Sequence, residues 1–427
     1  MQASQDASDG DCVVIGYTWD GKKLAGSSPV SWTRASRAAS TGKSQRSSGS
    51  TTSDSLSSGS SFVAAAVVSG PSTKAICTAL KQVRKTCPQT FTIVHSPQVS
   101  RSARGRLDCF RAGARMLAHD DAAVEQGLRT IMRQFDAAAS VPNPSGRVYS
   151  CPECGLAGLS EDALHLHFPL YHSMENTHAH DCPICDRRAS EFRAFAVHLH
   201  NEHGPIEERE PAFPAFAAFS WVICRRPSDG KLLLCHEPAA IAGGKPAYWF
   251  PAGRVDEGET FLMAGERETQ EEAGIQANVK GVLLFKLEGG LVPRVVLYAE
   301  PVEDQTKEQE EGAGGGQRSA AVGTTACIPK SLPDFESCGA VWLDVSELDN
   351  LTERDYRGGG TAELYRSVAS GELAPLPLDS LSYEALEEMV QRLTKDQDCL
   401  MDHWLAEIKR VWALLKEDYP SERLEME

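Results

Sequence analysis

Three glutamates stand close together in the stretch from Gly253 to Ile275. On a helix, Glu268, Glu271 and Glu272 lie at positions i, i+3 and i+4, so their carboxylates share one face. Three like charges side by side repel one another and would weaken that helix without a counter-ion. A divalent cation removes the repulsion, and Mg²⁺ is held in proteins by carboxylates together with substrate phosphates. The stretch therefore predicts a magnesium site for phosphate chemistry.

The residues around the glutamates predict how they are positioned. Arg267 can pair with Glu259 and so fix the preceding loop to the helix. Gly274 suits the position just past the end of a helix. The alternative interpretation is a solvated acidic helix that follows a glycine loop.

The spacing of these residues resembles the signature of the Nudix hydrolases, G-x5-E-x7-R-E-U-x-E-E-x-G-U, and every fixed letter is present between residues 253 and 275. The first U, usually a bulky apolar residue, is Thr269, which could loosen the packing behind the helix. The family cleaves a nucleoside diphosphate linked to another moiety, X, at the pyrophosphate. The resemblance implies an α/β/α sandwich with a mixed sheet over residues 213–370. Within it, the acidic and then Gly-rich composition of residues 303–329 predicts a flexible insertion.

The resemblance also implies roles for individual residues. The residues implied as catalytic or as ligands of Mg²⁺ or Mn²⁺ are Glu259, Arg267, Glu268, Glu271, Glu272 and the backbone carbonyl of Ala252. In this scheme the metal polarises the phosphoryl oxygens and activates a water, while Glu259 and Arg267 orient the helix. A glutamate of the cluster accepts the proton, or Glu288 does so from a later loop. We expect Glu271→Gln or Glu272→Gln to lower kcat at least about a hundredfold without unfolding the domain.

Substrate choice lies outside this signature. The run YWFPAGR, from Tyr248 to Arg254, resembles the WYLPAGR segment of animal Nudix enzymes that act on 8-oxoguanine nucleoside diphosphates. An oxidised nucleotide is therefore one candidate substrate. Trp249, Phe250 and Arg254 are candidate substrate contacts, and core packing is the alternative for the two aromatic residues. Arg294 either meets a phosphate or is an ordinary charge at a sheet edge.

Two repeats of cysteine and histidine occupy residues 150–204. Each has the spacing C-x2-C-x12-H-x4-H, which is typical of tetrahedral Zn²⁺ sites, and the repeats resemble tandem Cys2His2 zinc fingers. Leu164 and Phe195 are the expected core residues. The implied ligands are Cys151, Cys154, His167 and His172 in the first repeat, and Cys182, Cys185, His198 and His203 in the second. The other histidines of the repeats (His165, His178, His180 and His200) are expected at the surface, with His200 as an alternative ligand.

The charge of the repeats bears on what they bind. Residues 151–203 hold eight acidic side chains and three basic ones, and the segment between the repeats is not a short basic linker. Binding to the phosphate backbone of nucleic acid needs positive charge. A structural or protein-binding role is therefore favoured over DNA or RNA binding.

Composition places limits on the whole protein. The 427 residues include 43 basic and 59 acidic side chains, a net charge of −16, which argues against broad binding to nucleic acid or to anionic membranes. Apolar runs are shorter than the roughly 20 residues that span a bilayer. The acidic start lacks the layout of a signal peptide, so the thirteen cysteines indicate reduced thiols and a metal site. We expect a cytoplasmic or nuclear protein.

The two ends of the chain are less informative. Residues 1–145 alternate strand and helix patterns, which predicts a small parallel α/β domain, with a Ser/Gly-rich insertion at 25–61 that is expected to be disordered. The expected helices include Leu107–Met116. Residues 109–135 resemble the last third of a response-regulator receiver domain, but Ser69 and His119 replace its acidic residue and its lysine, so we expect no phosphorylation. Residues 380–427 predict amphipathic helices.

These patterns together predict a multidomain α+β and α/β protein that acts as a Mg²⁺-dependent hydrolase of a nucleoside diphosphate derivative. Structural Zn²⁺ and a protein partner of the fingers complete this hypothesis. One alternative is a zinc-finger adaptor whose Nudix domain only binds a nucleotide or a protein. Another is a pyrophosphohydrolase of RNA caps, with the fingers holding the RNA.

Overall fold

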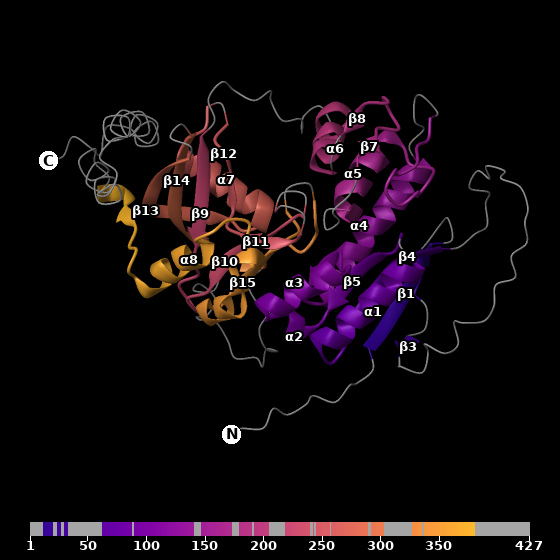
Figure 1. Cartoon of the computed structure of the whole chain (residues 1–427), viewed down its shortest axis with the longest axis horizontal. Helices are drawn as coiled ribbons and strands as arrows, with labels where there is room; N and C mark the ends of the chain where they lie inside the picture. The colour runs from indigo at the N-terminus through magenta and orange to yellow at the C-terminus, as the bar shows by residue number, and fades with distance from the viewer. Residues whose placement is uncertain are drawn as a thin grey trace, which may run out of the picture. The chain divides into compact units, whose positions relative to one another are not determined.

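The computed structural model describes residues 12–19, 24–26, 30–32, 62–87, 89–140, 147–172, 179–189, 192–204, 218–239, 242, 245–256, 258–288, 292–302, 327–334 and 337–380 (Figure 1). The chain divides into two compact units. The first holds residues 1–210, 237–247 and 331–338, and the second holds 211–236, 248–330 and 339–427. Every helix in the described part of the chain is too short or too polar to span a bilayer. The predicted domain boundaries stay a prediction.

The sheet of the first unit has the order β2-β1-β4-β5-β6, with β3 paired to β1. Its strands are β1 (Cys12–Trp19), β2 (Leu24–Gly26), β3 (Val30–Trp32), β4 (Phe62–Ser69), β5 (Phe91–His95) and β6 (Met116–Ala118). Strands β4, β5 and β6 run parallel, whereas β1 is antiparallel to β2, β3 and β4. Our prediction of a parallel sheet is therefore wrong for the first three strands, because a strand pattern in the sequence does not specify the direction of its pairing.

Two sequence-based boundaries in this unit are also wrong. Residues 25–26 and 30–32 lie in strands, so the predicted disorder is wrong at these positions, and residues 27–29 and 33–61 lie outside the described part. The helix expected at Leu107–Met116 ends at Ala112, since Gly113 adopts a left-handed backbone with φ +110 and terminates it. Met116 then begins strand β6.

Helices cover both faces of this sheet. The helices are α1 (Thr73–Thr86), α2 (Pro97–Ser100), α3 (Ala103–Ala112), α4 (Asp121–Ser140) and α5 (Glu161–His172). Apolar side chains of α1, α2 and α3, such as Leu80 and Phe110, pack on one face. Residues of α4 and α5, such as Ile131 and Tyr171, pack on the other. Helix α5 belongs to the first cysteine–histidine repeat, so that repeat contributes to the core of the α/β domain.

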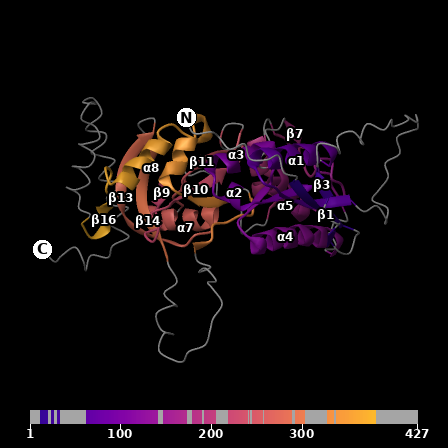
Figure 2. The ribbon, with the colours of Figure 1, turned by 90° about the horizontal axis from the view of Figure 1, so that it is seen from below.

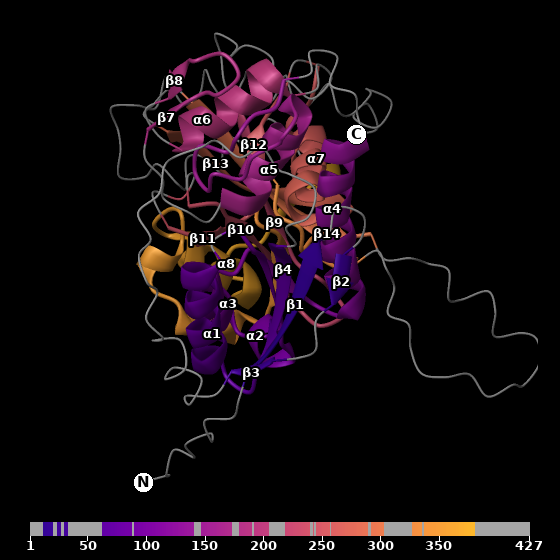
Figure 3. The same ribbon diagram turned by 90° about the vertical axis from the view of Figure 1, so that its right-hand side faces the viewer.

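The two cysteine–histidine repeats share one core. Besides α5 they contain β7 (His180–Asp181), β8 (Arg188–Ala189), α6 (Phe192–His198) and a π-helix, η3 (Leu199–His203). Figure 3 shows these elements gathered together. Phe168 of the first repeat meets Phe195 of the second edge to face, with ring centroids 4.7 Å apart. Leu164 and Phe195 are fully buried in this cluster, as predicted.

The second unit is built on two sheets. Its strands are β9 (Phe219–Cys224), β10 (Leu232–Glu237), β11 (Ala247–Trp249), β12 (Ala252–Arg254), β13 (Ala277–Glu288), β14 (Val292–Pro301), β15 (Ala340–Leu343) and β16 (Leu376–Pro377). The larger sheet has the order β12-β9-β14-β13-β16 and the smaller one β11-β10-β15. Strand β14 runs parallel to β9, and the other pairs of the larger sheet are antiparallel, so this sheet is mixed as expected.

Helices α7 (Phe261–Ala273) and α8 (Thr361–Ser370) lie on opposite sides of these strands (Figure 2). Helix α7 packs very closely on the larger sheet, because a side chain on Gly265 would come within 2.9 Å of Ser220 Oγ and 2.8 Å of Leu297. The Tyr365 hydroxyl of α8 donates to the Leu233 carbonyl of β10 at 2.9 Å. Short 3-10 helices, η7 (Val345–Asn350), η8 (Glu353–Asp355) and η9 (Leu378–Ser380), complete the unit.

Two further predictions concern segments that lie mostly outside the described residues. The expected flexible insertion at 303–329 is wrong for its last three residues, since the Cys327 carbonyl accepts a hydrogen bond from Trp342 Nε1 at 2.9 Å and Pro329 is buried. Residues 303–326 lie outside the described part. The amphipathic helices expected at 380–427 also lie outside it, apart from Ser380 in η9.

Candidate functional site

Helix α7 begins and ends at residues suited to those positions. Thr260 caps its first turn by accepting a hydrogen bond from the Met263 N–H at 3.2 Å. Gly274 follows the last residue in a left-handed conformation, φ +70, and its N–H reaches the carbonyls of the last turn. The predicted position of Gly274 is therefore confirmed. These two ends define the helix that carries the three glutamates.

Arg267 holds the acidic group together. Its guanidinium donates to both Glu259 oxygens, at 2.7 and 2.9 Å, which gives the predicted pairing of loop and helix. Its Nη1 donates to Glu268 and Glu271, each at 2.8 Å, and its Nη2 to the Arg254 carbonyl at 2.8 Å. Burial would raise the pKa of Glu259, but the bonds and the charge of Arg267 outweigh it and lower that pKa.

Glu268 lies against strand β12 at Gly253. A Cβ atom on Gly253 would overlap the Glu268 carboxylate, so only glycine leaves space for it. The side chain is buried, and burial raises the pKa of Glu268 to about 7, even though the Arg267 charge opposes the shift. The structure therefore brings a buried carboxylate to a strand that has no side chain at that point.

The other two glutamates have different surroundings. Glu272 is buried and accepts a hydrogen bond from the Ala252 N–H at 3.0 Å. Glu271 is exposed, and Lys330 Nζ donates to its backbone carbonyl at 2.7 Å. The three carboxylates share one side of α7 as predicted, with Glu268 and Glu271 bonded to Arg267 and Glu272 to the Ala252 N–H. Sequence reasoning missed Lys330, which lies 59 residues from Glu271 and carries no local signal.

The group fits a divalent cation. It offers hard carboxylate oxygens, which Mg²⁺ prefers, and it contains a buried carboxylate whose charge a cation would stabilise. Binding one ion would require the oxygens of Glu268, Glu271 and Glu272 to turn toward a common point. Arg267 Nη1 already lies between two of them.

Thr269, the departure from the resembled signature, is accommodated by a hydrogen bond. It is fully buried, and its Oγ1 donates to the Gly265 carbonyl at 2.7 Å. Our expectation that it loosens the packing is not supported, because Gly265 already sits in close contact with the sheet.

The residues proposed for substrate contact differ in accessibility. Phe250 and Trp249 are buried, with 1% and 8% of their surface exposed. Arg254 is half-buried, and its Nε donates to Asp256 at 3.2 Å. The Glu288 side chain lies outside the described part. The burial of the two rings agrees with the core-packing alternative.

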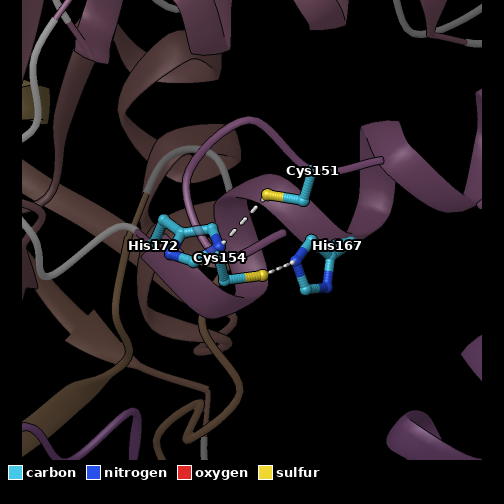
Figure 4. A group of neighbouring side chains, drawn as sticks. All are labelled: Cys151, Cys154, His167 and His172. Carbon is cyan, nitrogen blue, oxygen red and sulfur yellow. Dashed lines mark hydrogen bonds between the residues drawn. The ribbon is translucent and has the colours of Figure 1, made fainter. Parts of the chain in front are cut away.

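The cysteine–histidine repeats form two compact groups of ligand atoms. Figure 4 shows the first, in which Cys151 Sγ lies 3.5 Å from His172 Nε2 and Cys154 Sγ lies 3.4 Å from His167 Nε2. In the second, the corresponding distances are 3.5 Å (Cys182 and His203) and 3.3 Å (Cys185 and His198). Tetrahedral Zn²⁺, with bonds of about 2.3 Å to sulfur and 2.0 Å to nitrogen, places S and N about 3.5 Å apart. Both groups therefore fit zinc.

The two cysteine–histidine groups are more compact than the glutamate group. They are the only sets in the described residues with three or more Cys, His, Asp or Glu ligand atoms all within 4.8 Å of one another. Burial lowers the pKa of His167 and of His198, which keeps these imidazoles neutral as metal ligation requires. A hydrogen bond from Cys151, with further bonds from His167 and His172, lowers the pKa of Cys154 and favours its thiolate.

A contact between the repeats supports the second group. Glu161 Oε1, at the start of α5, lies 2.8 Å from His203 Nδ1. Such a carboxylate orients a ligating imidazole through its other nitrogen. Sequence reasoning missed Glu161, because it lies 42 residues from His203 and belongs to the other repeat.

Our expectation for the remaining histidines is wrong in two cases. His165 is buried and lies 3.4 Å from His200 Nδ1 across the interface of the repeats. His180 is half-buried and lies 3.0 Å from Glu153. His200 contacts His165 and is not part of the ligand group, because His203 takes that place. His178 lies outside the described part. The packing of the two repeats on each other explains why these side chains leave the surface.

Comparison with known proteins identifies the second unit. Residues 217–320 match the family model described as "NUDIX domain". This chain contains a Nudix domain. A Caenorhabditis elegans protein described as "Putative nudix hydrolase 1" is 26% identical over 189 residues, which are 42% of this chain and 45% of that protein. The chain therefore spans less than half the length of this relative.

Solved structures that resemble part of this chain include two enzymes. A NUDIX hydrolase from Nitrosomonas europaea is 18% identical, with a TM-score of 0.28, over 39% of this chain and 97% of that one. An ADP-ribose pyrophosphatase from Streptococcus suis is 17% identical, with a TM-score of 0.25, over 37% of this chain and 92% of that one. The family match and the description of the nematode relative both support a Nudix hydrolase.

Proposed function

We propose that this protein is a Mg²⁺-dependent hydrolase that cleaves the pyrophosphate linkage of a nucleoside diphosphate derivative. The observation that carries the proposal is the carboxylate group of α7, with Glu268 seated against Gly253 and Glu272 against the Ala252 N–H. The Nudix match over residues 217–320 supports the same reaction. Oxidised nucleotides are among the candidate substrates.

The residues of the site have two roles, as metal ligands and as positioning residues. Glu268, Glu271 and Glu272 would hold Mg²⁺ or Mn²⁺, and the bound ion would polarise phosphoryl oxygens and lower the pKa of a water. The Ala252 carbonyl is a further candidate ligand. Arg267 and Glu259 keep the loop and the helix in register through their paired hydrogen bonds.

The reaction balances as a hydrolysis. A water oxygen forms a new bond to phosphorus, and the bridging P–O bond breaks. The bridging oxygen leaves with the second phosphate. The proton of the water passes to a carboxylate of the group or of a neighbouring loop. The protein contributes orientation and charge, and it forms no covalent bond to the substrate.

A turnover screen with matched variants tests this proposal. Phosphate release would be measured with and without Mg²⁺ on oxidised and normal nucleotides, dinucleotides, nucleotide sugars and capped RNA. We expect Mg²⁺-dependent turnover of at least one class, and a fall in kcat of at least about a hundredfold in Glu272→Gln. Glu266→Gln is the control on the same helix, since its amide oxygen can still accept from the Val279 N–H. Turnover without Mg²⁺, or full activity in Glu272→Gln, contradicts the proposal.

We further propose that the two repeats bind structural Zn²⁺ and stabilise the α/β domain. Leu170 and Tyr171 of α5 pack in the core of that domain, and Gln89 donates to the Cys154 carbonyl at 2.9 Å. A finger helix used in this way does not offer its buried side to a DNA groove. The acidic charge of the repeats supports a protein partner over nucleic acid. A gel shift of the full chain on DNA and RNA at low salt is expected to show no salt-sensitive binding.

A further inference from the structure

The last turn of helix α7 is held from outside the helix by Lys330. The last four carbonyls of an α-helix have no partner within it. Here the Gly274 N–H donates to the Gln270 carbonyl at 2.9 Å. Lys330 supplies donors to two others, its backbone N–H to the Ala273 carbonyl at 2.8 Å and its Nζ to the Glu271 carbonyl at 2.7 Å. One residue therefore bonds to the end of the helix at two points.

Lys330 is itself anchored on a strand of the smaller sheet. Its carbonyl accepts a hydrogen bond from the Ala340 N–H of β15 at 2.8 Å. Earlier in the same segment, the Cys327 carbonyl accepts one from Trp342 Nε1 of that strand at 2.9 Å. Strand β15 in turn pairs with β10 along its whole length. The donors that reach α7 therefore come from a segment that the sheet holds in place.

The contact between Lys330 and the end of the helix is close. A Cβ atom on Gly274 would lie 3.0 Å from the Lys330 Cβ and 3.2 Å from the Lys330 backbone nitrogen. Gly274 also has φ +70, a conformation that residues with a side chain rarely adopt. Glycine at this position therefore serves both the turn that ends the helix and the approach of Lys330.

The turn that Lys330 holds carries two of the three candidate metal ligands. Glu271 and Glu272 lie in this last turn, whereas Glu268 lies one turn earlier, against Gly253. The ends of helices fray more readily than their middles. The Glu271 side chain is exposed, so its position depends on the backbone that carries it more than on packing. Mg²⁺ requires nearly ideal octahedral geometry, which a frayed turn would not provide.

We propose that Lys330 is a positioning residue of the hydrolase, which fixes the last turn of α7 so that Glu271 and Glu272 can bind one metal ion together. This inference rests on the proposed function, because it takes Mg²⁺ or Mn²⁺ as the ion of that site. It deepens that function by assigning a role in metal binding to a residue outside the stretch from Gly253 to Ile275. Lys330 acts through the helix and not by contact with the substrate.

Two substitutions separate the ammonium of Lys330 from its backbone. The last carbonyls of a helix carry partial negative charge, so a cation beside them is favourable. Lys330→Met removes this charge and the hydrogen bond to the Glu271 carbonyl, but it keeps an apolar stem and both backbone bonds. Lys330→Arg keeps a positive charge and N–H donors. A role of the ammonium therefore predicts a defect in the first variant that the second one largely restores.

Two measurements on the full chain test this role without turnover. Binding of Mn²⁺ would be followed by electron paramagnetic resonance in the absence of substrate. Hydrogen exchange of the α7 amides would be followed by mass spectrometry in the absence of Mn²⁺ and Mg²⁺. We expect Lys330→Met to weaken Mn²⁺ binding about threefold to tenfold, because a charge-assisted hydrogen bond at the helix end is lost. We also expect faster exchange in the last turn of α7 and unchanged exchange in its first half, and recovery of both in Lys330→Arg.

Two control variants separate positioning from a general loss of charge or of helix stability. Lys280→Met removes an exposed lysine of β13 and should leave Mn²⁺ binding unchanged. Thr260→Val removes the cap at the other end of α7, so it should lower the stability of the helix without weakening Mn²⁺ binding.

The proposal is overturned by unchanged Mn²⁺ binding in Lys330→Met, or by equal weakening in Lys330→Met and Thr260→Val, which would indicate a general loosening of the helix. A wild-type chain that does not bind Mn²⁺ also overturns it. A wild-type chain that binds Mn²⁺ but hydrolyses none of the nucleotide classes contradicts the proposed function instead, so the two failures are distinguishable.

Discussion

The cysteine–histidine groups and the glutamate group of α7 differ in how completely the protein assembles them. In each cysteine–histidine group four ligand atoms already lie within 4.8 Å of one another. In the glutamate group, Arg267 and the Ala252 N–H hold the carboxylates instead. A closed set of four protein ligands is typical of structural zinc, while a site that shares its ion with substrate phosphates stays open. Under the proposed function, this difference separates ions that would stabilise the fold from an ion that would be used in turnover.

The largest expected effect comes from removing a ligand of a closed group. We expect Cys154→Ser to lower the zinc content from about two ions per chain to about one and to destabilise the first unit by several kcal/mol, because zinc binding contributes roughly 10 kcal/mol or more to the folding of such units. Zinc analysis and thermal unfolding measure both effects. Cys87→Ser, at a free cysteine that ends α1, is the control. Two retained zinc ions in Cys154→Ser would show that Cys154 is not a required zinc ligand.

A smaller but still large effect is expected at the open group. In Gly253→Ala the new Cβ displaces the Glu268 carboxylate, and we expect kcat/KM to fall at least about a hundredfold, as when a metal ligand is lost. Overpacking should also lower the free energy of unfolding by about 1–3 kcal/mol. Gly359→Ala, whose Cβ meets nothing within 4 Å, is the matched control. Equal kinetics in both variants would mean that the position of Glu268 does not matter.

The sequence predicted both groups but not their surroundings. The ligand spacing of the repeats and the helical spacing of the glutamates are local, so they can be read along the chain. Glu161 beside His203, and Lys330 beside Glu271, come together only through the packing of distant segments. The antiparallel direction of β1 was missed for a similar reason, since strand direction depends on partners that a strand pattern does not name.

A moderate effect on zinc affinity is expected from Glu161, which lies in the first repeat and contacts a ligand of the second. We expect Glu161→Ala to weaken zinc binding in the second group by about tenfold or more, because the carboxylate orients the His203 imidazole. Competition with a chromogenic chelator measures this affinity. Asp162→Ala, at the exposed neighbouring acid, should leave it unchanged. If both variants weaken zinc binding alike, the general loss of negative charge is the cause.

The smallest effect, on the free energy of unfolding, is expected at Thr269, on the buried side of helix α7. We expect Thr269→Val to change the free energy of unfolding by less than about 0.5 kcal/mol, because its hydroxyl only adds a bond to a helical carbonyl. Thr260→Val on the same helix removes the cap and should lower it by about 1 kcal/mol. Urea unfolding distinguishes the two. A loss above 1 kcal/mol in Thr269→Val would show that this hydroxyl is required in the core.

The glutamate group also shows where prediction from sequence ends. The fixed letters of the resembled signature located Glu259, Arg267 and Gly274, and the structure shows each at its expected place. The substrate residues could not be located in this way. Trp249 and Phe250 are buried, and sequence reasoning did not select Arg357, whose guanidinium lies over the Trp249 ring.

Titration of the chain with Mn²⁺, followed by electron paramagnetic resonance, tests most directly whether the two kinds of group bind different ions. Zinc content would be measured on the same samples, with wild type, Glu272→Gln and Glu266→Gln compared. We expect the wild type and Glu266→Gln to bind Mn²⁺ while keeping about two zinc ions, and Glu272→Gln to keep the zinc but bind Mn²⁺ at least about tenfold more weakly. Unchanged Mn²⁺ binding in Glu272→Gln, or displacement of zinc by Mn²⁺, would contradict the separation of the two sites.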